Sequence, residues 1–351
     1  MEDQLFILLQ VAQYLTATRG HSAPEARLCY QQAESLCHSL HDPLPLYVAL
    51  LGQWHCSLLT DKLSVTMQIA RRLYALAQEQ NDSAQLIGAY RALAGTHHFS
   101  GDFESACKHA RCGVQLWRSG VVRSHAEDLD ASAVVCICYE ALSAWHFGEI
   151  TSSHATMAEA IALAKELNDT HALVAALHFA AILSQLECDP AEVARLVSAL
   201  MELSARYHFA VWLAGGEILG GWARSASGNP ADGLAWIEEG IRDYRATNSM
   251  LRMPYYLALK AEALHLADRT AEALETIQEA EAVVERYEER GSCAELHRFR
   301  AVFLTAMGAD EAQIEAAFCE AIRIAKQQKS ISLLKRAEAS QAEYRSRRGS
   351  R

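Results

Sequence analysis

The amino-acid sequence predicts an all-α fold, a right-handed superhelix of about eight helical hairpins followed by one C-terminal capping helix. The first observation is a recurring turn signal, because residue pairs that interrupt a helix begin at Cys188, Gly228 and Asp268, 40 residues apart. Recurrence at a period of about 20–50 residues is typical of stacked repeats. The second is composition, since 51% of the 351 residues are hydrophobic and only 6 are proline, which favours helix.

The same phase extends along the chain in both directions. One interval is 47 residues instead of 40, and the surplus falls near Ser119–Asp130, where we expect a longer loop. The turn signals begin at positions 61, 101, 148, 188, 228, 268 and 308.

Each unit contains two segments with apolar residues at helical spacing. In one unit these segments are Gln85–Phe99 and Phe103–Trp117. Between them, Gly101 can end the first helix in a left-handed conformation and Asp102 can cap the second. The chain is therefore predicted to be a single domain, 1–351. Its hairpins are expected at 5–40, 44–80, 83–118, 131–167, 171–206, 209–247, 252–289 and 293–328, with the capping helix at 331–347.

Small residues recur at one position of the first helix in most units. Two helices approach to the short end of the 8–10 Å range of axial separations only where the side chains between them are small. These positions are therefore predicted to be the close contacts within the hairpins. They are Ala94, Ala141, Ala181, Gly221, Ala261 and Ala301.

A small residue eight places into the first helix, a Gly-Asp or Gly-Asn turn and a small residue five positions later form the tetratricopeptide (TPR) pattern. The residues that fit it best are Tyr90, Leu93, Ala94, Gly101, Asp102, Phe103 and Ala106. The 40-residue period is longer than the usual 34. This long version resembles the helical C-terminal region of bacterial STAND-type signalling ATPases, of adenylate cyclase-linked regulators and of LuxR-type regulators such as the maltose activator. Pro254–Leu259 and Ala294–Arg298 carry the more specific part of the resemblance.

The resemblance implies a regulatory region that follows an output domain and an ATPase in signal transduction or transcriptional regulation. The sequence has no G-x-x-x-x-G-K-[ST] loop to hold phosphates. We therefore expect a non-catalytic chain. It is either a fragment of a larger ATPase or cyclase or a free-standing repeat protein.

Charge and composition argue against several other functions. The formal net charge is −11, which argues against direct nucleic-acid binding, and the basic C-terminal end is either a solvated helix end or a binding tail. No apolar run approaches the roughly 18 residues of a membrane span. The 10 Cys and 15 His show no metal-site spacing, so we predict no metal and no cofactor. Unpaired Cys favours a reducing, cytoplasmic location.

The first helices of stacked hairpins line the concave side of a superhelix, and one face of each is expected to stay open as a groove. Trp, His, Arg and Glu together on that face indicate recognition. The alternatives are packing for the Trp residues, ordinary hydrogen bonding for the His residues and an ion pair between repeats for the charged ones. The predicted binding residues are His98, Trp145, His178, Trp222, Tyr255, Glu262, Glu295 and Arg298.

Two functions remain open from the sequence. In the first, the chain is a regulatory scaffold whose groove holds a protein partner, or a covalently linked output or ATPase domain. In the second, the repeats curl into a tube that senses a small-molecule effector. A wide open groove would favour the first function, and a closed superhelix with an enclosed pocket would favour the second.

Overall fold

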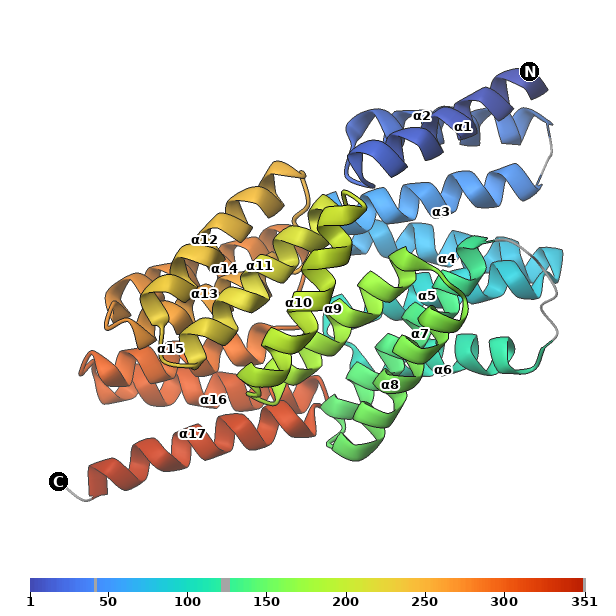
Figure 1. The fold of residues 1–351 in the computed structure, drawn as a ribbon. Coiled ribbons are helices and arrows are strands. Elements are labelled where there is room, and N and C mark those ends of the chain that lie inside the picture. The colour runs from blue at the N-terminus through green and yellow to red at the C-terminus, as the bar shows by residue number, and fades with distance from the viewer. Residues whose placement is uncertain (41–42, 121–126, 350–351) are drawn as a thin grey trace.

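The structure is a computed structural model that describes residues 1–40, 43–120 and 127–349. All regular secondary structure in these residues is helical, and the seventeen helices follow one another as stacked pairs. Figure 1 shows a curved array that runs from α1 at the N-terminus to α17 at the C-terminus. The predicted all-α solenoid is confirmed.

The array has two parts that meet each other in space. The N-terminal part consists of α1 (Glu2–Arg19), α2 (Pro24–Leu40), α3 (Pro43–Thr60), α4 (Leu63–Gln80), α5 (Ser83–Ser100), α6 (Phe103–Arg118), α7 (Glu127–His146), α8 (Ile150–Glu166) and α9 (Thr170–Leu186). The C-terminal part consists of α10 (Pro190–Arg206), α11 (Ala210–Ala226), α12 (Pro230–Ala246), α13 (Met253–Leu266), α14 (Thr270–Tyr287), α15 (Cys293–Ala306), α16 (Glu311–Gln327) and α17 (Ile331–Gly349).

The turns within the hairpins reproduce the 40-residue phase. Left-handed backbone costs an ordinary side chain roughly 1–2 kcal/mol, which explains why most of these turn residues are glycine. The side chain of Asp102 then accepts a hydrogen bond from the Ser105 N–H (3.0 Å), and Asp189 caps the Glu192 N–H in the same way (3.0 Å). The turn residues with positive φ are Gly101 (83°), Gly148 (78°), Cys188 (56°), Gly228 (97°), Asp268 (59°) and Gly308 (68°).

The small residues lie where helices of a hairpin touch, as predicted. A Cβ atom built on Gly221 in α11 would lie 2.6 Å from the carbonyl oxygen of Gly233 in α12, and one built on Gly233 would lie 2.4 Å from the Gly221 oxygen. Only glycine allows the two backbones to come so close. Ala181 and Ala261, at the equivalent position of other units, are fully buried.

Several helix boundaries differ from the prediction by a few residues. Within the loop expected near Ser119–Asp130, α7 already begins at Glu127, and residues 121–126 lie outside the described part of the chain. Acidic residues favour helix N-termini, so the charged run that predicted a loop starts a helix instead. At the other end, α17 extends to Gly349 rather than 347.

The array curls until loops of the C-terminal part contact helices of the N-terminal part. The N–H of Met250, between α12 and α13, donates to the carbonyl of Leu59 in α3 (2.8 Å). The N–H groups of Arg290 and Gly291, between α14 and α15, both donate to the carbonyl of Phe99 in α5 (2.9 and 3.0 Å). We call these contacts, together with those that residues 328–336 make to the N-terminal part, the closure seam.

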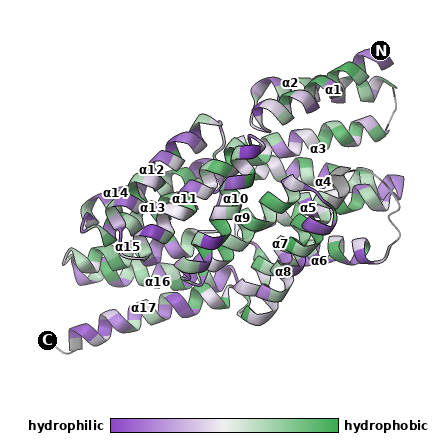
Figure 2. Ribbon diagram, viewed as in Figure 1, coloured by the Kyte–Doolittle hydropathy of each residue, from purple (hydrophilic) through white to green (hydrophobic). Residues whose placement is uncertain are grey.

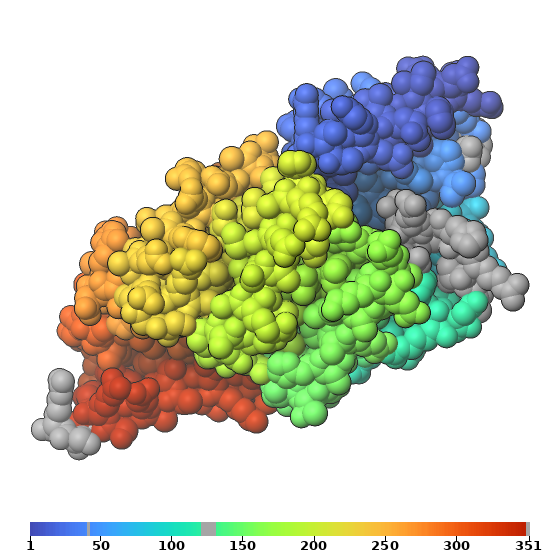
Figure 3. All heavy atoms as spheres, viewed as in Figure 1, coloured from blue at the N-terminus to red at the C-terminus, as the bar shows by residue number. Residues whose placement is uncertain are grey.

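Helix α17 and the loop before it complete the closure seam. The Ser330 Oγ lies 2.9 Å from Nδ1 of His146 at the end of α7, and the Ser332 hydroxyl donates to the carbonyl of Trp145 (2.5 Å). Arg336 donates to a main-chain carbonyl at the end of α9. The helix predicted as a cap therefore also joins the two parts of the array. Its C-terminal half is hydrophilic (Figure 2), and it lies along one edge of the face drawn in Figure 3.

Candidate functional site

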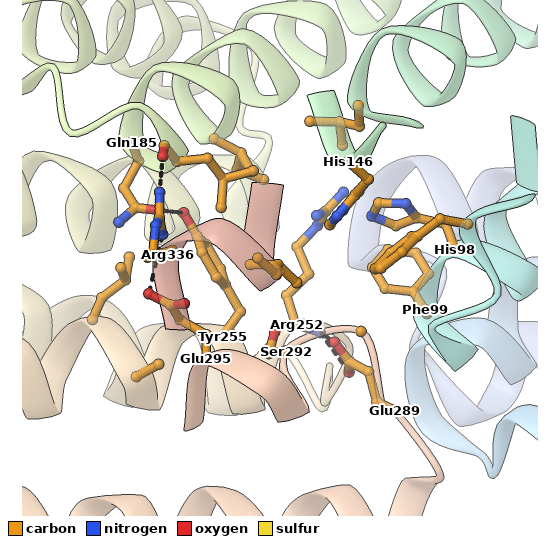
Figure 4. Close-up of a pocket in the computed structure, with 18 of the residues that line it drawn as sticks. His98, Phe99, His146, Gln185, Arg252, Tyr255, Glu289, Ser292, Glu295 and Arg336 are labelled. Carbon is orange, nitrogen blue, oxygen red and sulfur yellow. Dashed lines mark hydrogen bonds and ion pairs between the residues drawn. The ribbon is translucent and has the colours of Figure 1, made fainter. Parts of the chain in front are cut away.

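A cavity of about 80 Å³, partly open to solvent, lies between the two parts of the array. By the same measure one water needs about 10–15 Å³, so the cavity has room for a small molecule or a few waters but not for a peptide strand. Figure 4 shows side chains from both parts converging on it. The N-terminal part supplies His98, Phe99, His146 and Gln185, and the C-terminal part supplies Arg252, Tyr255, Glu289, Ser292, Glu295 and Arg336.

One end of the cavity holds a carboxylate between two arginines. Glu295, near the start of α15, accepts hydrogen bonds from Arg298 in the same helix (2.9 and 2.5 Å) and from Arg336 in α17 (3.0 Å). Burial alone would raise the pKa of Glu295, but the charges and hydrogen bonds of the two arginines outweigh it and lower the pKa to about 2. Glu295 is therefore ionised throughout the physiological range.

A second set of polar contacts ties this end of the cavity across the closure. The Tyr255 hydroxyl in α13 donates to Oε1 of Gln185 in α9 (2.8 Å). The guanidinium carbon of Arg336 lies 5.6 Å from the ring centroid of Trp145 in α7, within cation–π range. Side chains of α13 and α17 thus contact the ends of α7 and α9 from inside the superhelix.

The other end of the cavity holds a carboxyl group that has no cationic side chain bonded to it. Both oxygens of Glu289 accept hydrogen bonds from the backbone N–H of Arg252 (3.1 and 2.9 Å). Burial raises the pKa of Glu289 to about 8, although the N–H and the charge of Arg252 both act to lower it. At pH 7 this carboxyl group is mostly protonated and neutral.

Two histidines of the N-terminal part line the same end. Burial, with a smaller contribution from the charge of Arg252, lowers the pKa of His98 to about 3. Burial also lowers the pKa of His146 well below its ordinary value, and its ring stacks on Phe103 with the ring planes 12° apart. Both imidazoles are neutral at pH 7. Among the described residues, Nδ1 of His98 is buried without a hydrogen-bond partner.

Three of the eight residues predicted from the sequence line the cavity, namely His98, Tyr255 and Glu295. Two more contact residues that line it, because Arg298 binds Glu295 and Trp145 lies beside Arg336.

The other three predicted residues lie elsewhere in the interior. Trp222 Nε1 donates to Glu262 (2.7 Å), and this bond partly offsets the burial that raises the pKa of Glu262. His178 Nε2 lies 3.0 Å from the Tyr256 hydroxyl. The predicted charged set is thus divided, since Glu262 pairs with an indole while Glu295 and Arg298 pair with each other.

The expectation of an open groove is wrong. Trp145, His178 and Trp222 are only 3%, 1% and 2% exposed. Side chains of the C-terminal part cover all three, since Arg336 packs over Trp145, Tyr256 contacts His178 and Glu262 binds Trp222 within that same part. Whether these residues bind a ligand stays a prediction.

Several residues of the cavity were not predicted. Arg252 and Glu289 stand at the two ends of the predicted hairpin 252–289, and in the structure they lie in the connections beside it. Arg336 belongs to the basic C-terminal helix, which was interpreted as a solvated helix end or a binding tail. One signal was available: the connection between α12 and α13 spans residues 247–252 and is longer than most others. Long connections are often functional.

The described residues lack two features that would point to other functions. No group of three or more His, Cys, Asp or Glu side chains is placed to hold a metal ion. Among the described helices, none combines the length and the apolar character needed to cross a lipid bilayer.

Comparison with known proteins places the chain by its fold. No family model matches it. An uncharacterized protein of Rhizobium meliloti (strain 1021) is 31% identical over 207 residues, which are 58% of this chain. The match covers 20% of that protein, so this chain corresponds to about a fifth of the length of its curated relative.

Two of the similar solved structures contain a bound peptide or factor. A Rap protein complexed with competence and sporulation factor superposes with a TM-score of 0.64 at 11% identity, covering 98% of this chain and 99% of that one. NprR in complex with its cognate peptide NprX gives a TM-score of 0.55 at 9% identity, covering 96% and 97%. At such identities the likeness concerns the fold. It confirms that the chain is a TPR-like helical repeat protein, the class that the turn and small-residue pattern predicted.

Proposed function

We propose that this chain is a non-catalytic regulatory module of bacterial signalling, which binds an effector inside its closed superhelix and passes the change to a protein partner or a linked output domain. The observation that carries the proposal is the closure of the array around a cavity lined by buried charged groups. A small pocket lined from both parts of the array favours an effector sensor over a scaffold with a wide open groove.

The energetic cost of the buried charged groups favours a functional role for them. Burying charged groups costs free energy unless each is paired and hydrogen-bonded, and an apolar filling is often at least as stable. Elsewhere the same repeats pack without such groups, as the glycine contact between α11 and α12 demonstrates. Stacking of hairpins therefore does not require Arg252, Glu289, Glu295 and Arg336 in the interior.

The position of the cavity supports a role in regulation. Its walls come from both parts of the array, so a ligand that contacts both would stabilise the closed state over any state in which the closure seam is open. Differential affinity of this kind is what shifts a conformational equilibrium. The seam includes several single hydrogen bonds, each of which contributes about 0.5–1.5 kcal/mol net to stability.

The resemblance noted in the sequence is compatible with this proposal. Both of its more specific stretches supply residues of the cavity, Tyr255, Ala258 and Leu259 from one and Glu295 from the other. The relative in Rhizobium meliloti extends far beyond the matched segment. We therefore propose that output is delivered through a further domain or a protein partner in the cytoplasm, without direct contact to nucleic acid or membrane.

A peptide or protein segment is the second candidate for the occupant. Its support is the likeness to helical regulators solved with a peptide or factor bound. The cavity of about 80 Å³ is too small for a peptide strand, so this candidate requires the closure seam to open.

Native mass spectrometry of the chain purified from its own bacterium tests the proposal. We expect an additional mass that is released when the protein unfolds, and a higher melting temperature when the released material is added back. A mass of a few hundred daltons supports the effector, and a peptide mass supports the second candidate. Absence of any retained mass, with no stabilisation by either the low-mass or the peptide fraction of the cell extract, would overturn both.

A further inference from the structure

Arg252 is held in the cavity by a backbone conformation that ordinary side chains avoid. It precedes α13 with φ of 64°, in the left-handed region, and is 8% exposed. Its N–H binds both oxygens of Glu289, which fixes the backbone there. Strained, buried positions of this kind cost roughly 1–3 kcal/mol and are concentrated at functional sites.

The guanidinium of Arg252 packs against aromatic faces instead of a carboxylate. Its central carbon lies 4.9 Å from the ring centroid of Phe99 and 4.8 Å from that of Phe179. Among the described residues it forms no ion pair, and no hydrogen bond of its side chain is found. Arg336, the other arginine of the cavity, is by contrast occupied by Glu295 and a main-chain carbonyl.

The carboxyl group that binds the backbone of Arg252 does not neutralise its side chain. Burial keeps Glu289 mostly protonated at pH 7, as its pKa of about 8 indicates, and its oxygens already accept the backbone N–H. At the other end of the cavity, one charge on Glu295 is shared by two arginines. The cavity therefore carries an excess of positive charge inside a chain whose net charge is −11.

His98 adds a second unused polar group on the same wall. Its ring is neutral, and Nδ1 is buried without a partner among the described residues. A neutral imidazole can carry its proton on Nδ1 and donate a hydrogen bond from there. In Figure 4 the side chain of Arg252 extends across the cavity toward the side where His98 and His146 lie.

We propose that the effector is a small molecule that carries an oxyanion, a carboxylate or a phosphate, and that this group binds to the guanidinium of Arg252 with His98 as a second hydrogen-bond donor. The inference rests on the proposed function and names the ligand class of the same cavity. Guanidinium groups recognise both kinds of oxyanion through paired N–H donors. The polar pair Tyr255 and Gln185 is then available for the remainder of the ligand.

Melting temperature and calorimetry at constant ionic strength test the proposal, with inorganic phosphate and acetate as probes and chloride as the reference anion. We expect phosphate, acetate or both to raise the melting temperature of the full chain above the value in chloride. A response to phosphate alone indicates a phosphate-bearing effector, and a response to acetate alone indicates a carboxylate. Equal melting temperatures in all three salts would overturn the proposal.

Two variants locate the response. Arg252→Met keeps the length of the side chain without its charge and should weaken binding of the active probe at least tenfold. Arg242→Met removes an arginine that is 67% exposed on α12 and should leave binding unchanged. An unaltered response in Arg252→Met means an adventitious ion only, and rejects the site.

Two further measurements keep the test decisive if Arg252→Met does not fold. Arg252→Lys retains the charge and should bind the probe more weakly than the wild type. Crystals of the wild type soaked in selenate should show an anomalous peak beside Arg252, and a peak only at other places contradicts the proposal. If native mass spectrometry instead finds a neutral or cationic small molecule, the sensor function stands and the oxyanion assignment fails.

Discussion

Glu295 and Glu289 lie in one cavity and are both buried, yet their charge states are opposite. Glu295 faces the guanidinium groups of Arg298 and Arg336, and its pKa falls to about 2. Glu289 accepts only a backbone N–H from Arg252, whose guanidinium points away to two phenylalanines, and its pKa rises to about 8. Burial is common to both, so the position of the cation decides which carboxyl group is ionised. One end of the cavity is a completed ion cluster, and the other is a cation without its anion.

The largest expected difference in stability between the two ends of the cavity comes from replacing each carboxyl group by an amide. Glu295→Gln leaves two partly buried arginines without their anion and should destabilise the fold by about 3 kcal/mol. Glu289→Gln replaces a mostly neutral group by another acceptor for the Arg252 N–H and should cost less than about 1 kcal/mol. Urea unfolding at pH 7 measures both. Equal losses of stability would show that the two carboxyl groups do not differ as described.

The pH dependence of stability should separate the same two groups. Glu295 binds its proton less readily in the folded state, so its contribution is present above about pH 4.5 and is lost as the pH falls toward 2. Glu289 binds its proton more readily when folded, so stability falls as the pH rises from about 4.5 to 8. Glu289→Gln should therefore gain stability relative to the wild type between pH 5 and 8. A constant difference over that range contradicts the raised pKa of Glu289.

Replacing Arg336 should cost more stability than replacing Arg252, but the difference should be smaller than that between the two carboxyl groups. Arg336→Met removes one partner of Glu295 and one bond of the closure seam, and should destabilise by about 1–2 kcal/mol. Arg252→Met loses the contacts with two aromatic rings, but it also removes the cost of a buried charge that no anion compensates. Because these effects oppose each other, the free energy of unfolding should change by no more than about 1 kcal/mol. Urea midpoints of the two variants, measured in chloride without other anions, decide this. A larger loss for Arg252→Met would assign it a structural role.

The smallest effect is expected outside the cavity, where an ion pair of the seam faces solvent. Lys329 binds Glu104 at 2.5 Å, but their side chains are 62% and 65% exposed. Exposed pairs gain little because water screens them. Lys329→Ala should therefore leave the urea midpoint unchanged within error, and a clear shift would mean that the seam depends on its surface charges.

The sequence predicted the features of this fold that depend on neighbouring residues. Gly101 and Gly228 mark turns because a left-handed residue is a local requirement, and Gly221 marks a helix contact because that contact lies within one hairpin. Closure of the array depends instead on the curvature that many small packing angles add up to. No short stretch of sequence encodes it, so the open groove was expected in error.

The same distinction explains which cavity residues could be predicted. His98, Tyr255 and Glu295 lie on first helices at positions that helical phase assigns to the inner face. Arg252 and Glu289 lie in connections, where phase carries no information and only the tertiary contact with the N-terminal part gives them a role. Arg336 is basic on a terminal helix, and its sequence context is that of a solvated residue.

The closure seam also limits how such a chain can evolve. Open repeat arrays lengthen easily by duplication, because each repeat contacts only its neighbours. Here backbone hydrogen bonds join Met250 to Leu59, and Gly291 to Phe99, across long stretches of sequence. A duplicated unit inserted between these partners would move every later loop past its acceptor and break all the bonds at once. The number of repeats between the two edges of the seam is therefore fixed by geometry, whereas additions beyond either end of the array leave the partners in register.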